Sequence, residues 1–507
     1  MFTVRLRLKT TVHDRQVIEK RFRAIHHIHN VLVKRAKSLL QVLKDNAEYQ
    51  ALRAAYGKLL EKSTLSEEEN IRKKELASRM NEIRKEIGLS EYGLQSYIKV
   101  CVLKFQKCIG SNEAQKEATR VWRGVEKVLF FDGKDIHYKK ESEIYSICDK
   151  TNTTGIMFKK DIFSIKWFGL EIPCAYPKKE KDIAYVEAAL ENKISYCEVT
   201  RIMFPNGWHY YVTLYLKGDA PKTGHKVAEP GNVTGIDMGV STVAAASDNK
   251  VILEELAPKS KEFNKKINQI LRYMDRSRRA MNPKKYKSDG TIDRSNKDKW
   301  AYSNSYMKAW RKLRSLYRQK AAYIKTSHGE LANRMLEDSV DFLVEDMNFK
   351  GLQHRAKKTE RSDKVSIVKN KDGSEKEVHK FKKKKRFGKS INDRAPAEFL
   401  SILEQKAVRN GGNMKKVNTR EFKASQYDHS TGECKKCLLS ERFKTIDGRT
   451  VQRDLYSAFL IKNSNKSLKN PDQKKCKEGF DNFCKLSDNL IMEMKEKGIS
   501  MKQCFGF

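Results

Sequence analysis

The first half of the chain shows two successive hydrophobic patterns. Residues 2–9 alternate strictly, with apolar side chains on one face and basic ones on the other. A period of two predicts a half-buried strand with a basic outer face. Helical spacing of apolar residues then continues to about residue 120, and residues 64–69 supply cap residues followed by acids, a typical helix start. The sequence therefore predicts one strand and then a helical insert, whose basic faces suit a nucleic-acid surface.

Short β-rich runs replace the helical pattern between residues 125 and 225. They include residues 128–131, 154–158 and 163–168. The clearest run alternates apolar and polar residues over 208–216, directly after a Pro-Asn-Gly turn. Together with the first strand, these runs predict a small β-barrel that the helical insert interrupts.

The second half has the pattern of an α/β domain that follows a Gly/Pro/Lys linker over residues 217–230. Apolar runs predict strands within residues 233–255, 340–348 and 413–418, and helical spacing predicts helices within residues 257–340 and 395–408. Residues 352–390 are basic and of low complexity, which predicts a mobile loop or a phosphate-binding segment. Residues 466–507 are rich in Lys and Asn and are expected to be peripheral.

Composition and charge narrow the function. The 507 residues include 104 Lys and Arg against 64 Asp and Glu, a net charge of +40. Such an excess indicates a polyanionic partner. No apolar run approaches the ~18–20 residues that span a bilayer, and the charged first residues do not fit a signal peptide. We therefore expect a location inside the cell, nucleic acid as the partner, and no membrane contact.

Basic side chains gather on the helices predicted within residues 257–340. Aromatic residues are interleaved with them, which suits contact with a nucleic-acid backbone and some base stacking. Trp310 and Tyr317 are seven residues apart and are interpreted as core. The residues predicted to bind nucleic acid are Arg276, Arg278, Arg279, Lys284, Lys285, Lys308, Arg311, Arg314 and Arg318.

Cysteine and histidine offer weaker metal-site candidates. Among ten cysteines, only Cys434 and Cys437 form a Cys-x-x-Cys pair, which is half of a zinc ribbon. His429 could supply a third ligand, but half-sites seldom hold metal, so we expect no bound Zn²⁺. His26, His27 and His29 have no Cys or acidic partner at ligand spacing and are interpreted as a solvated helix face.

Three acids of the second half stand in matching settings. Asp237 lies in an apolar strand, Glu345 ends a later strand and Asp454 begins a helix. Three carboxylates brought together are stable as anions only around cations. Asp237, Glu345 and Asp454 would clamp two Mg²⁺ or Mn²⁺ ions about 3.5–4 Å apart, which activate water and stabilise the leaving oxygen of a phosphodiester. Taken alone, the first motif also fits a strand that ends in an Asp-Met-Gly turn.

Five short motifs accompany these acids. They are Gly235-Ile-Asp237-Met-Gly239, Thr326-Ser-His328-x-x-Leu-Ala332, Val344-Glu345-Asp-Met-Asn348, Asn392-x-Arg394-Ala-Pro396 and Arg453-Asp454-x-x-x-Ala458. The acids and their settings resemble the RuvC nuclease version of the RNase H-like fold. With all five motifs, the chain resembles TnpB, the transposon-encoded RNA-guided nuclease, and the compact type V CRISPR effectors related to it. Matching features cover about residues 206–460.

The resemblance implies a function and a domain organisation in a prokaryotic, nucleoid-associated protein. A guide RNA would pair with target DNA, the protein would read a short flanking motif, and one site with Asp237, Glu345 and Asp454 as catalytic acids would cut both strands. The expected domains are a wedge-like β-barrel from residues 1–10 and 121–225, a helical recognition lobe over 11–120, a RuvC-like nuclease domain from 226–424 and 445–465, a degenerate zinc-ribbon-like insert over 425–444, and a basic C-terminal tail over 466–507.

Two positions depart from the family pattern. The ribbon lacks one cysteine pair, so we expect Leu438, Leu439 and Phe443 to pack it without zinc. Tyr456 stands where the family favours Asn, which makes Asp447 the fallback for the third acid. An active RNA-guided DNA endonuclease is the first prediction because all three acid positions are filled. A nuclease-inactive RNA-guided repressor and an unguided transposase-like nuclease stay open as alternatives.

Overall fold

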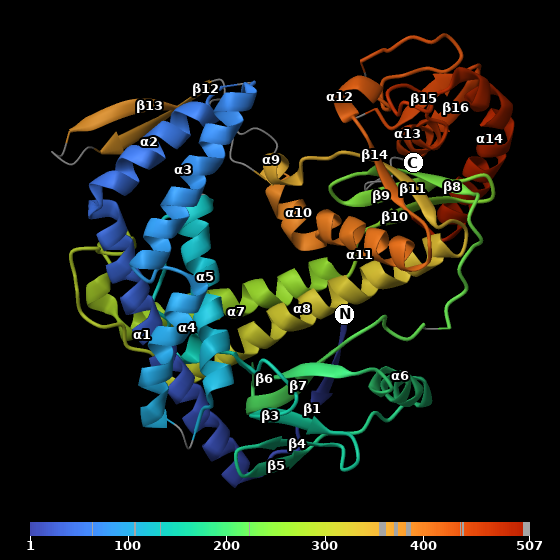
Figure 1. The fold of residues 1–507 in the computed structure, drawn as a ribbon. Helices are drawn as coiled ribbons and strands as arrows, with labels where there is room; N and C mark the ends of the chain where they lie inside the picture. The colour runs from blue at the N-terminus through green and yellow to red at the C-terminus, as the bar shows by residue number, and fades with distance from the viewer. Residues whose placement is uncertain are drawn as a thin grey trace. The chain divides into compact units, whose positions relative to one another are not determined.

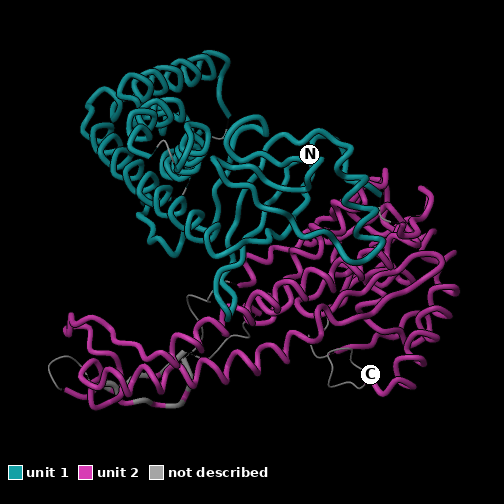
Figure 2. Tube along the Cα trace, turned by 90° about the horizontal axis from the view of Figure 1, so that it is seen from below, with its two compact units in different colours: residues 1–223 teal, residues 224–507 magenta. Residues whose placement is uncertain are grey.

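The protein has a mixed fold with α-helices and several β-sheets (Figure 1). The computed structural model describes residues 1–62, 64–105, 108–131, 133–222, 224–353, 361–369, 374–381, 387–436, 438 and 441–499. Contacts divide the chain into two compact units, Met1–Thr223 and Gly224–Phe507 (Figure 2). The division falls within the predicted linker. Among the described residues, no helix is both long and apolar enough to cross a membrane.

The first unit combines helices with two small antiparallel sheets. Its helices are α1 (Val12–Asp45), α2 (Ala47–Leu60), α3 (Glu67–Glu86), α4 (Glu91–Val102), η1 (Leu103–Phe105), α5 (Ser111–Phe130), η2 (Glu141–Glu143) and α6 (Glu180–Leu190). Its strands are β1 (Phe2–Arg7), β2 (Ser146–Cys148), β3 (Ile156–Lys159), β4 (Ser164–Trp167), β5 (Leu170–Pro173), β6 (Ile194–Phe204) and β7 (Gly207–Leu216).

The strands of this unit pair into two sheets, in the orders β1-β7-β6-β2 and β3-β4-β5. An isolated bridge between Leu8 and Cys174 links the first strand to the second sheet. The strand over 2–7 and the hairpin at Gly207 are confirmed. A closed barrel is not among the strand pairings that the structure describes, so the predicted barrel stays unconfirmed.

Local capping explains where the long helices begin. Thr11 and Asp14 form a capping box at the start of α1, and Ser66 and Glu69 form another at the start of α3, as the sequence predicts. The prediction that residues 128–131 form a strand is wrong, because α5 continues to Phe130. Buried residues Val121 and Val125 continue the helical period of this segment. The helical part therefore extends about ten residues past the predicted limit of residue 120.

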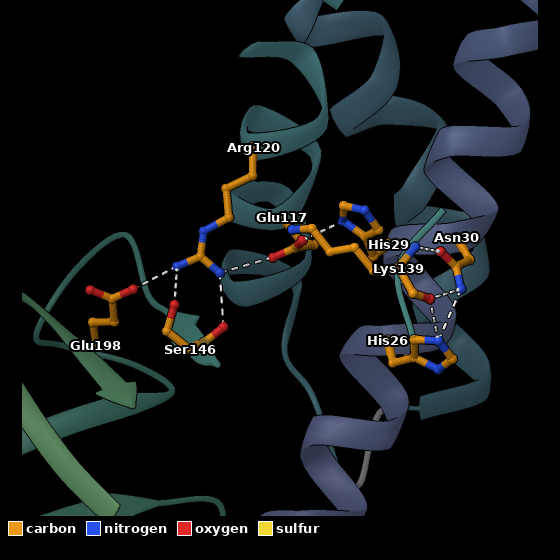
Figure 3. A network of polar contacts seen from close by, with 8 residues as sticks. All are labelled: His26, His29, Asn30, Glu117, Arg120, Lys139, Ser146 and Glu198. Carbon is orange, nitrogen blue, oxygen red and sulfur yellow. Dashed lines mark hydrogen bonds and ion pairs between the residues drawn. The ribbon is translucent and has the colours of Figure 1, made fainter. Parts of the chain in front are cut away.

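A buried polar network joins α1, α5 and the first sheet (Figure 3). His29 Nδ1 lies 2.7 Å from Glu117 Oε1, and the other oxygen of Glu117 accepts a 3.0 Å hydrogen bond from Arg120. Arg120 also donates to Glu198 on β6 at 2.6 Å. His26 Nε2 contacts the Lys139 carbonyl oxygen at 2.8 Å. Of the three histidines interpreted as a solvated face, only His27 is exposed, and the other two are structural.

The second unit contains a central five-stranded sheet between helices. Its strands are β8 (Val233–Met238), β9 (Thr242–Ala246), β10 (Val251–Glu255), β11 (Asp341–Glu345), β12 (Arg361–Lys369), β13 (Glu375–Phe381), β14 (Met414–Val417), β15 (Phe443–Ile446) and β16 (Arg449–Gln452). Its helices are α7 (Ser260–Met281), η3 (Pro283–Lys285), α8 (Asn304–Leu336), α9 (Phe349–Gln353), α10 (Gly388–Arg394), α11 (Pro396–Arg409), α12 (Thr419–Phe422), α13 (Arg453–Lys462) and α14 (Gln473–Glu496).

The central sheet has the order β10-β9-β8-β11-β14, in which β8, β11 and β14 are parallel and β9 is antiparallel to both neighbours. Alternate residues of β9 enter two different cores. Ala244 and Ala246 pack with α13 and α14 on one face, while Val243 and Ala245 pack with α8 and α11 on the other (Figure 1). The near-continuous apolar runs of these strands reflect burial on both faces.

Two sequence predictions for this unit are corrected by the structure. Residues 352–390 were expected to form a mobile loop or a phosphate-binding segment, and the loop alternative is wrong for the part that forms the antiparallel hairpin of β12 and β13. The basic run at 382–386 lies outside the described residues. The C-terminal tail is not peripheral, since α14 buries Cys476, Phe480 and Phe483 against α13. The rings of Phe459 and Phe483 stack with centroids 4.6 Å apart.

A buried carboxyl makes the stability of the first unit depend on pH. Glu113 is 1% exposed and accepts hydrogen bonds from Trp167 Nε1 at 2.9 Å and from the Gly110 amide at 2.7 Å. Burial, with the nearby charge of Asp149, raises the pKa of Glu113 from 4.5 to about 7. The unfolded chain therefore loses this proton at lower pH than the folded chain does, so stability falls as pH rises from about 4.5 to 7.

We expect Glu113→Gln to abolish this loss of stability, which amounts to roughly 3 kcal/mol between the two pKa values. Urea denaturation at a series of pH values measures it. Glu126→Gln, at a partly exposed position of the same helix, is the control and should keep the wild-type slope. An unchanged slope in the Glu113 variant would contradict the assignment.

A candidate active site of three acids

Two of the predicted acids lie at the ends of neighbouring strands. β8 and β11 are parallel, and Ile236 pairs with Val344 in their register. Asp237 and Glu345 are the next residues along the two strands, so both stand at the carboxyl-terminal edge of the sheet. Open α/β sheets bind ligands outside this edge.

A glycine brings the third acid to the same place. A Cβ at Gly235 would lie 2.2 Å from the Ala458 carbonyl oxygen and 2.3 Å from the Lys462 amide nitrogen. Only glycine lets the backbone of α13 approach β8 so closely. Gly235 and Asp237 project from the same face of the strand, while Asp454 and Ala458 lie one turn apart on the helix. This contact therefore carries Asp454 toward Asp237.

The electrostatics of Asp237 depend on both of the other acids. Burial raises the pKa of Asp237 well above its ordinary value, and the charges of Asp454 and Glu345 raise it further. Arg453 and the Ser457 hydroxyl act in the opposite direction. Burial also raises the pKa of Glu345 to about 7. The arrangement favours protons or cations between these carboxyl groups over three bare charges.

Two arginines contact the carboxylate of Asp454. Arg442 Nη1 lies 3.2 Å from Asp454 Oδ2, and Arg453 Nη2 lies 3.2 Å from Oδ1. Arg453 also donates to the Leu438 carbonyl oxygen at 3.1 Å and, through its amide, to the Arg442 carbonyl oxygen at 2.8 Å. The two arginines thereby tie the segment before β15 to the third acid. The sequence did not predict that Arg442 and Arg453 contact the third acid, although Arg453 directly precedes Asp454 in the motif Arg453-Asp454-x-x-x-Ala458.

The acid group fits a hard cation by its chemistry. Carboxylate oxygens are the preferred ligands of Mg²⁺, which takes one or two carboxylates together with substrate phosphates. In the described ranges, no three His, Cys, Asp or Glu side chains stand close enough to bind one ion as they are placed. Because Asp454 contacts two guanidinium groups, a cation at this carboxylate would share its oxygens with them or compete with them.

The third acid is better assigned to Asp454 than to Asp447. Asp447 is exposed at the turn between β15 and β16, where its φ is 48°. Tyr456, the residue that departs from the family pattern, is fully buried on another face of α13. Its hydroxyl lies 2.8 Å from His429 Nδ1 and accepts a 3.1 Å hydrogen bond from the His429 amide. The tyrosine therefore anchors the 425–436 segment through His429 and makes no contact of its own with the Asp454 carboxylate among the hydrogen bonds of the described residues.

The predicted half-ribbon is partly described. His429 is buried, and its ring packs against Phe480 with centroids 4.7 Å apart, so the histidine belongs to the core. Cys434 is exposed, and Cys437 and Leu439 lie outside the described residues. The prediction that Leu438 packs this segment is wrong, since its side chain is 68% exposed, and Phe443 is also exposed.

Residues of the other motifs support the sheet from its α8 face. His328 is fully buried, and its Nε2 lies 2.8 Å from the Arg394 carbonyl oxygen. Arg394 in turn forms a buried ion pair with Glu255 at the end of β10. These motif residues join α8, α10 and β10, so their contacts are structural.

The nine basic residues predicted to bind nucleic acid have three different environments. Arg276, Arg279, Lys284 and Lys308 are exposed, while Arg278, Arg311, Arg314 and Arg318 are half-buried. Arg278 and Arg279 both pair with Asp275, at 2.7 and 2.8 Å. Lys285 is only 5% exposed, which contradicts its prediction as a surface contact.

Lys285 has a structural role in the connection between α7 and α8. Its Nζ donates to the Asn296 carbonyl oxygen at 3.3 Å and lies 5.0 Å from the centre of the Trp300 ring. Trp310 packs in the small core between these helices, as predicted. The interpretation of Tyr317 as core is wrong, because its side chain is 49% exposed.

Comparisons with known proteins found similarity among solved structures. No protein-family model matches the chain, and no curated protein matches it. A cryo-EM structure of a Cas12f1-sgRNA-target DNA complex is similar over 91% of this chain and 98% of that one, with 13% identity and a TM-score of 0.26. A CRISPR-Cas12f ternary complex covers 91% and 99%, with 13% identity and a TM-score of 0.28.

The contacts of Asp454 predict a competition between Arg442 and a cation. Arg442→Gln should strengthen Mn²⁺ binding by roughly tenfold, because it removes one charged partner of that carboxylate. Electron paramagnetic resonance of the full chain titrated with Mn²⁺ measures the affinity. Arg449→Gln, on the same hairpin but paired with exposed Asp481, is the control. Equal affinity in wild type and the Arg442 variant would argue against the competition.

Exposed and buried lysines of this region should differ in their effects on nucleic-acid binding and on stability. Lys284→Gln with Lys308→Gln should reduce the salt slope of RNA binding by about one per lysine and leave the melting temperature unchanged, because both side chains are exposed. Lys285→Gln should instead lower the melting temperature. Fluorescence anisotropy at several salt concentrations and thermal denaturation measure the two. Equal salt slopes for the double variant and wild type would remove these lysines from the interface.

Proposed function

We propose that this chain is a metal-dependent, RNA-guided DNA endonuclease with an RNase H-like, RuvC-type nuclease domain in its second unit. The observation that carries the proposal is the meeting of Asp237, Glu345 and Asp454, whose mutual charge and burial raise the pKa of Asp237. The five-stranded sheet with helices on both faces supports the same domain type. All three acids come from the elements that the resemblance to TnpB and the compact type V effectors assigns to them.

In this proposal the three carboxylates hold Mg²⁺ or Mn²⁺, which supplies an activated water and stabilises the leaving oxygen when bound. The protein contributes a fixed, partly buried set of negative oxygens at one edge of a rigid sheet. Arg453 and the Ser457 hydroxyl stabilise the ionised form of Asp237, because both lower the pKa that burial and the other two acids raise. The reaction is phosphodiester hydrolysis, in which water adds to phosphorus and the bond to the leaving oxygen breaks.

The guided part of the proposal rests on the motif resemblance and on charge. A net charge of +40 suits the simultaneous binding of a guide RNA and both strands of target DNA. The first unit is proposed to supply the wedge-like and recognition regions, and the second unit the nuclease. The short flanking motif of the target would be read by the protein itself.

Single carboxylate changes test the nuclease. Glu345→Gln should lower guided cleavage at least about a hundredfold and leave binding of RNA and DNA unchanged, because the carboxylate is assigned to metal. Asp346→Asn is the matched control, since Asp346 is the next residue, is exposed and pairs with Lys416. Asp454→Asn and Asp447→Asn form a second matched pair. Cleavage should stop in EDTA, and metal-independent cutting would refute the mechanism.

The RNA that copurifies with the protein separates the proposal from its alternatives. A discrete RNA together with carboxylate-dependent cleavage supports the guided nuclease. A discrete RNA without cleavage in wild type would indicate the repressor. Cleavage without any specific RNA would indicate an unguided nuclease. Sequencing of the bound RNA, followed by a cleavage assay on the matching DNA, measures both properties.

A further inference from the structure

A hollow with lysines and apolar residues in its lining lies in the second unit, at the start of the strands whose ends carry the acids. It has a volume of about 400 Å³. Its walls come from the first residues of β8 and β11, from the region of β14, and from the loop between α13 and α14. The lining side chains that the argument uses are Lys415, Lys462, Lys466, Lys475, Asp341 and Ser464.

The charge of this hollow is strongly unbalanced. Four lysines line it against one aspartate. The carboxylate of Asp341 already has hydrogen-bond partners. Its Oδ1 accepts hydrogen bonds from the Asn413 amide at 3.0 Å and from Asn413 Nδ2 at 2.6 Å. Lys462 is paired with Asp248. The other three lysines are exposed and face a space that concentrates positive charge.

A buried hydroxyl also lines the hollow. Ser464 is only 6% exposed, and its Oγ has no hydrogen-bond partner among the described residues. Burial of an unpaired hydroxyl destabilises a protein unless a partner is supplied. Its backbone is held in place, because the Ser464 amide donates to the Ile461 carbonyl oxygen at 3.3 Å and the residue forms an isolated bridge with Pro471. The hydroxyl therefore lacks a partner within the described protein, and a ligand that enters the hollow next to Ser464 could supply one.

We propose that this hollow binds a phosphate group, carried either by a nucleic acid or by a free phosphate compound. Lysine ammonium groups and a hydroxyl are donors that match the oxygens of phosphate. The site is separate from the three acids, because Asp341 and Glu345 are four residues apart on an extended strand, about 13 Å. The proposal does not depend on nuclease activity, since none of its residues belongs to the acid group.

The test uses the full chain and pyrophosphate as the probe, with ionic strength held constant by potassium chloride. Calorimetric titration should detect binding that Ser464→Ala weakens about tenfold. This variant should keep or slightly raise the melting temperature, because it removes an unpaired buried hydroxyl. Lys415→Gln with Lys475→Gln should also weaken binding at least about tenfold. Lys485→Gln with Lys495→Gln, two exposed lysines elsewhere on α14, should bind as wild type does.

Short DNA oligonucleotides with and without a 5′-phosphate show whether the bound phosphate comes from a nucleic-acid backbone, from its terminus or from a free phosphate compound. Ser464-dependent binding of both oligonucleotides would assign the site to backbone phosphates, and binding only of the phosphorylated one to terminal phosphates. Ser464-dependent binding of pyrophosphate alone would assign it to free phosphate compounds. Each of these results supports the site. Absence of pyrophosphate binding, or equal weakening in the control variant, would overturn the proposal.

Discussion

The close approach of α13 to β8 at Gly235 is the constraint on which the second unit depends. Any side chain at that position would collide with the Ala458 carbonyl oxygen and the Lys462 amide. Because the helix lies directly on the strand, its first turn reaches the edge of the sheet where Asp237 and Glu345 end. The same contact lets Tyr456 and Phe459 enter the core that α14 completes. One glycine therefore governs both the packing of the C-terminal helices and the convergence of the acids.

The cost of gathering carboxylates is distributed over the surrounding residues. Asp237 and Glu345 share this cost, since burial of their carboxyl groups raises both pKa values and the charges of Asp454 and Glu345 raise that of Asp237 further. Asp454 is compensated by Arg442 and Arg453, which also hold the segment before β15. If Asp454 held a metal ion, Arg442 and Arg453 would compete with the ion for its carboxylate oxygens, which would link ion binding to the position of this segment. The arginines are therefore part of the site's electrostatics.

Basic residues of this chain serve two different purposes. Arg120 and Lys285 are tied into the protein by hydrogen bonds to neighbouring elements. Others, such as Lys284 and Lys308, project into solvent and remain available to a polyanion. A net charge of +40 therefore overstates the basic surface that is open to a polyanionic partner. The polar network around Glu117 shows how some of this charge stabilises the joint between helices and sheet.

Local pattern determined much of the secondary structure and the identity of the acids. Alternation predicted the strand at residues 2–7, capping residues predicted the start of α3, and an acid in an apolar strand marked Asp237, because these signals depend on near neighbours. The burial of His29 and Lys285, the packing of α14 and the contact of Arg442 with Asp454 depend on partners distant in sequence. Only the tertiary structure decided them, since a side chain's partner and exposure are set by elements that periodicity does not place relative to one another.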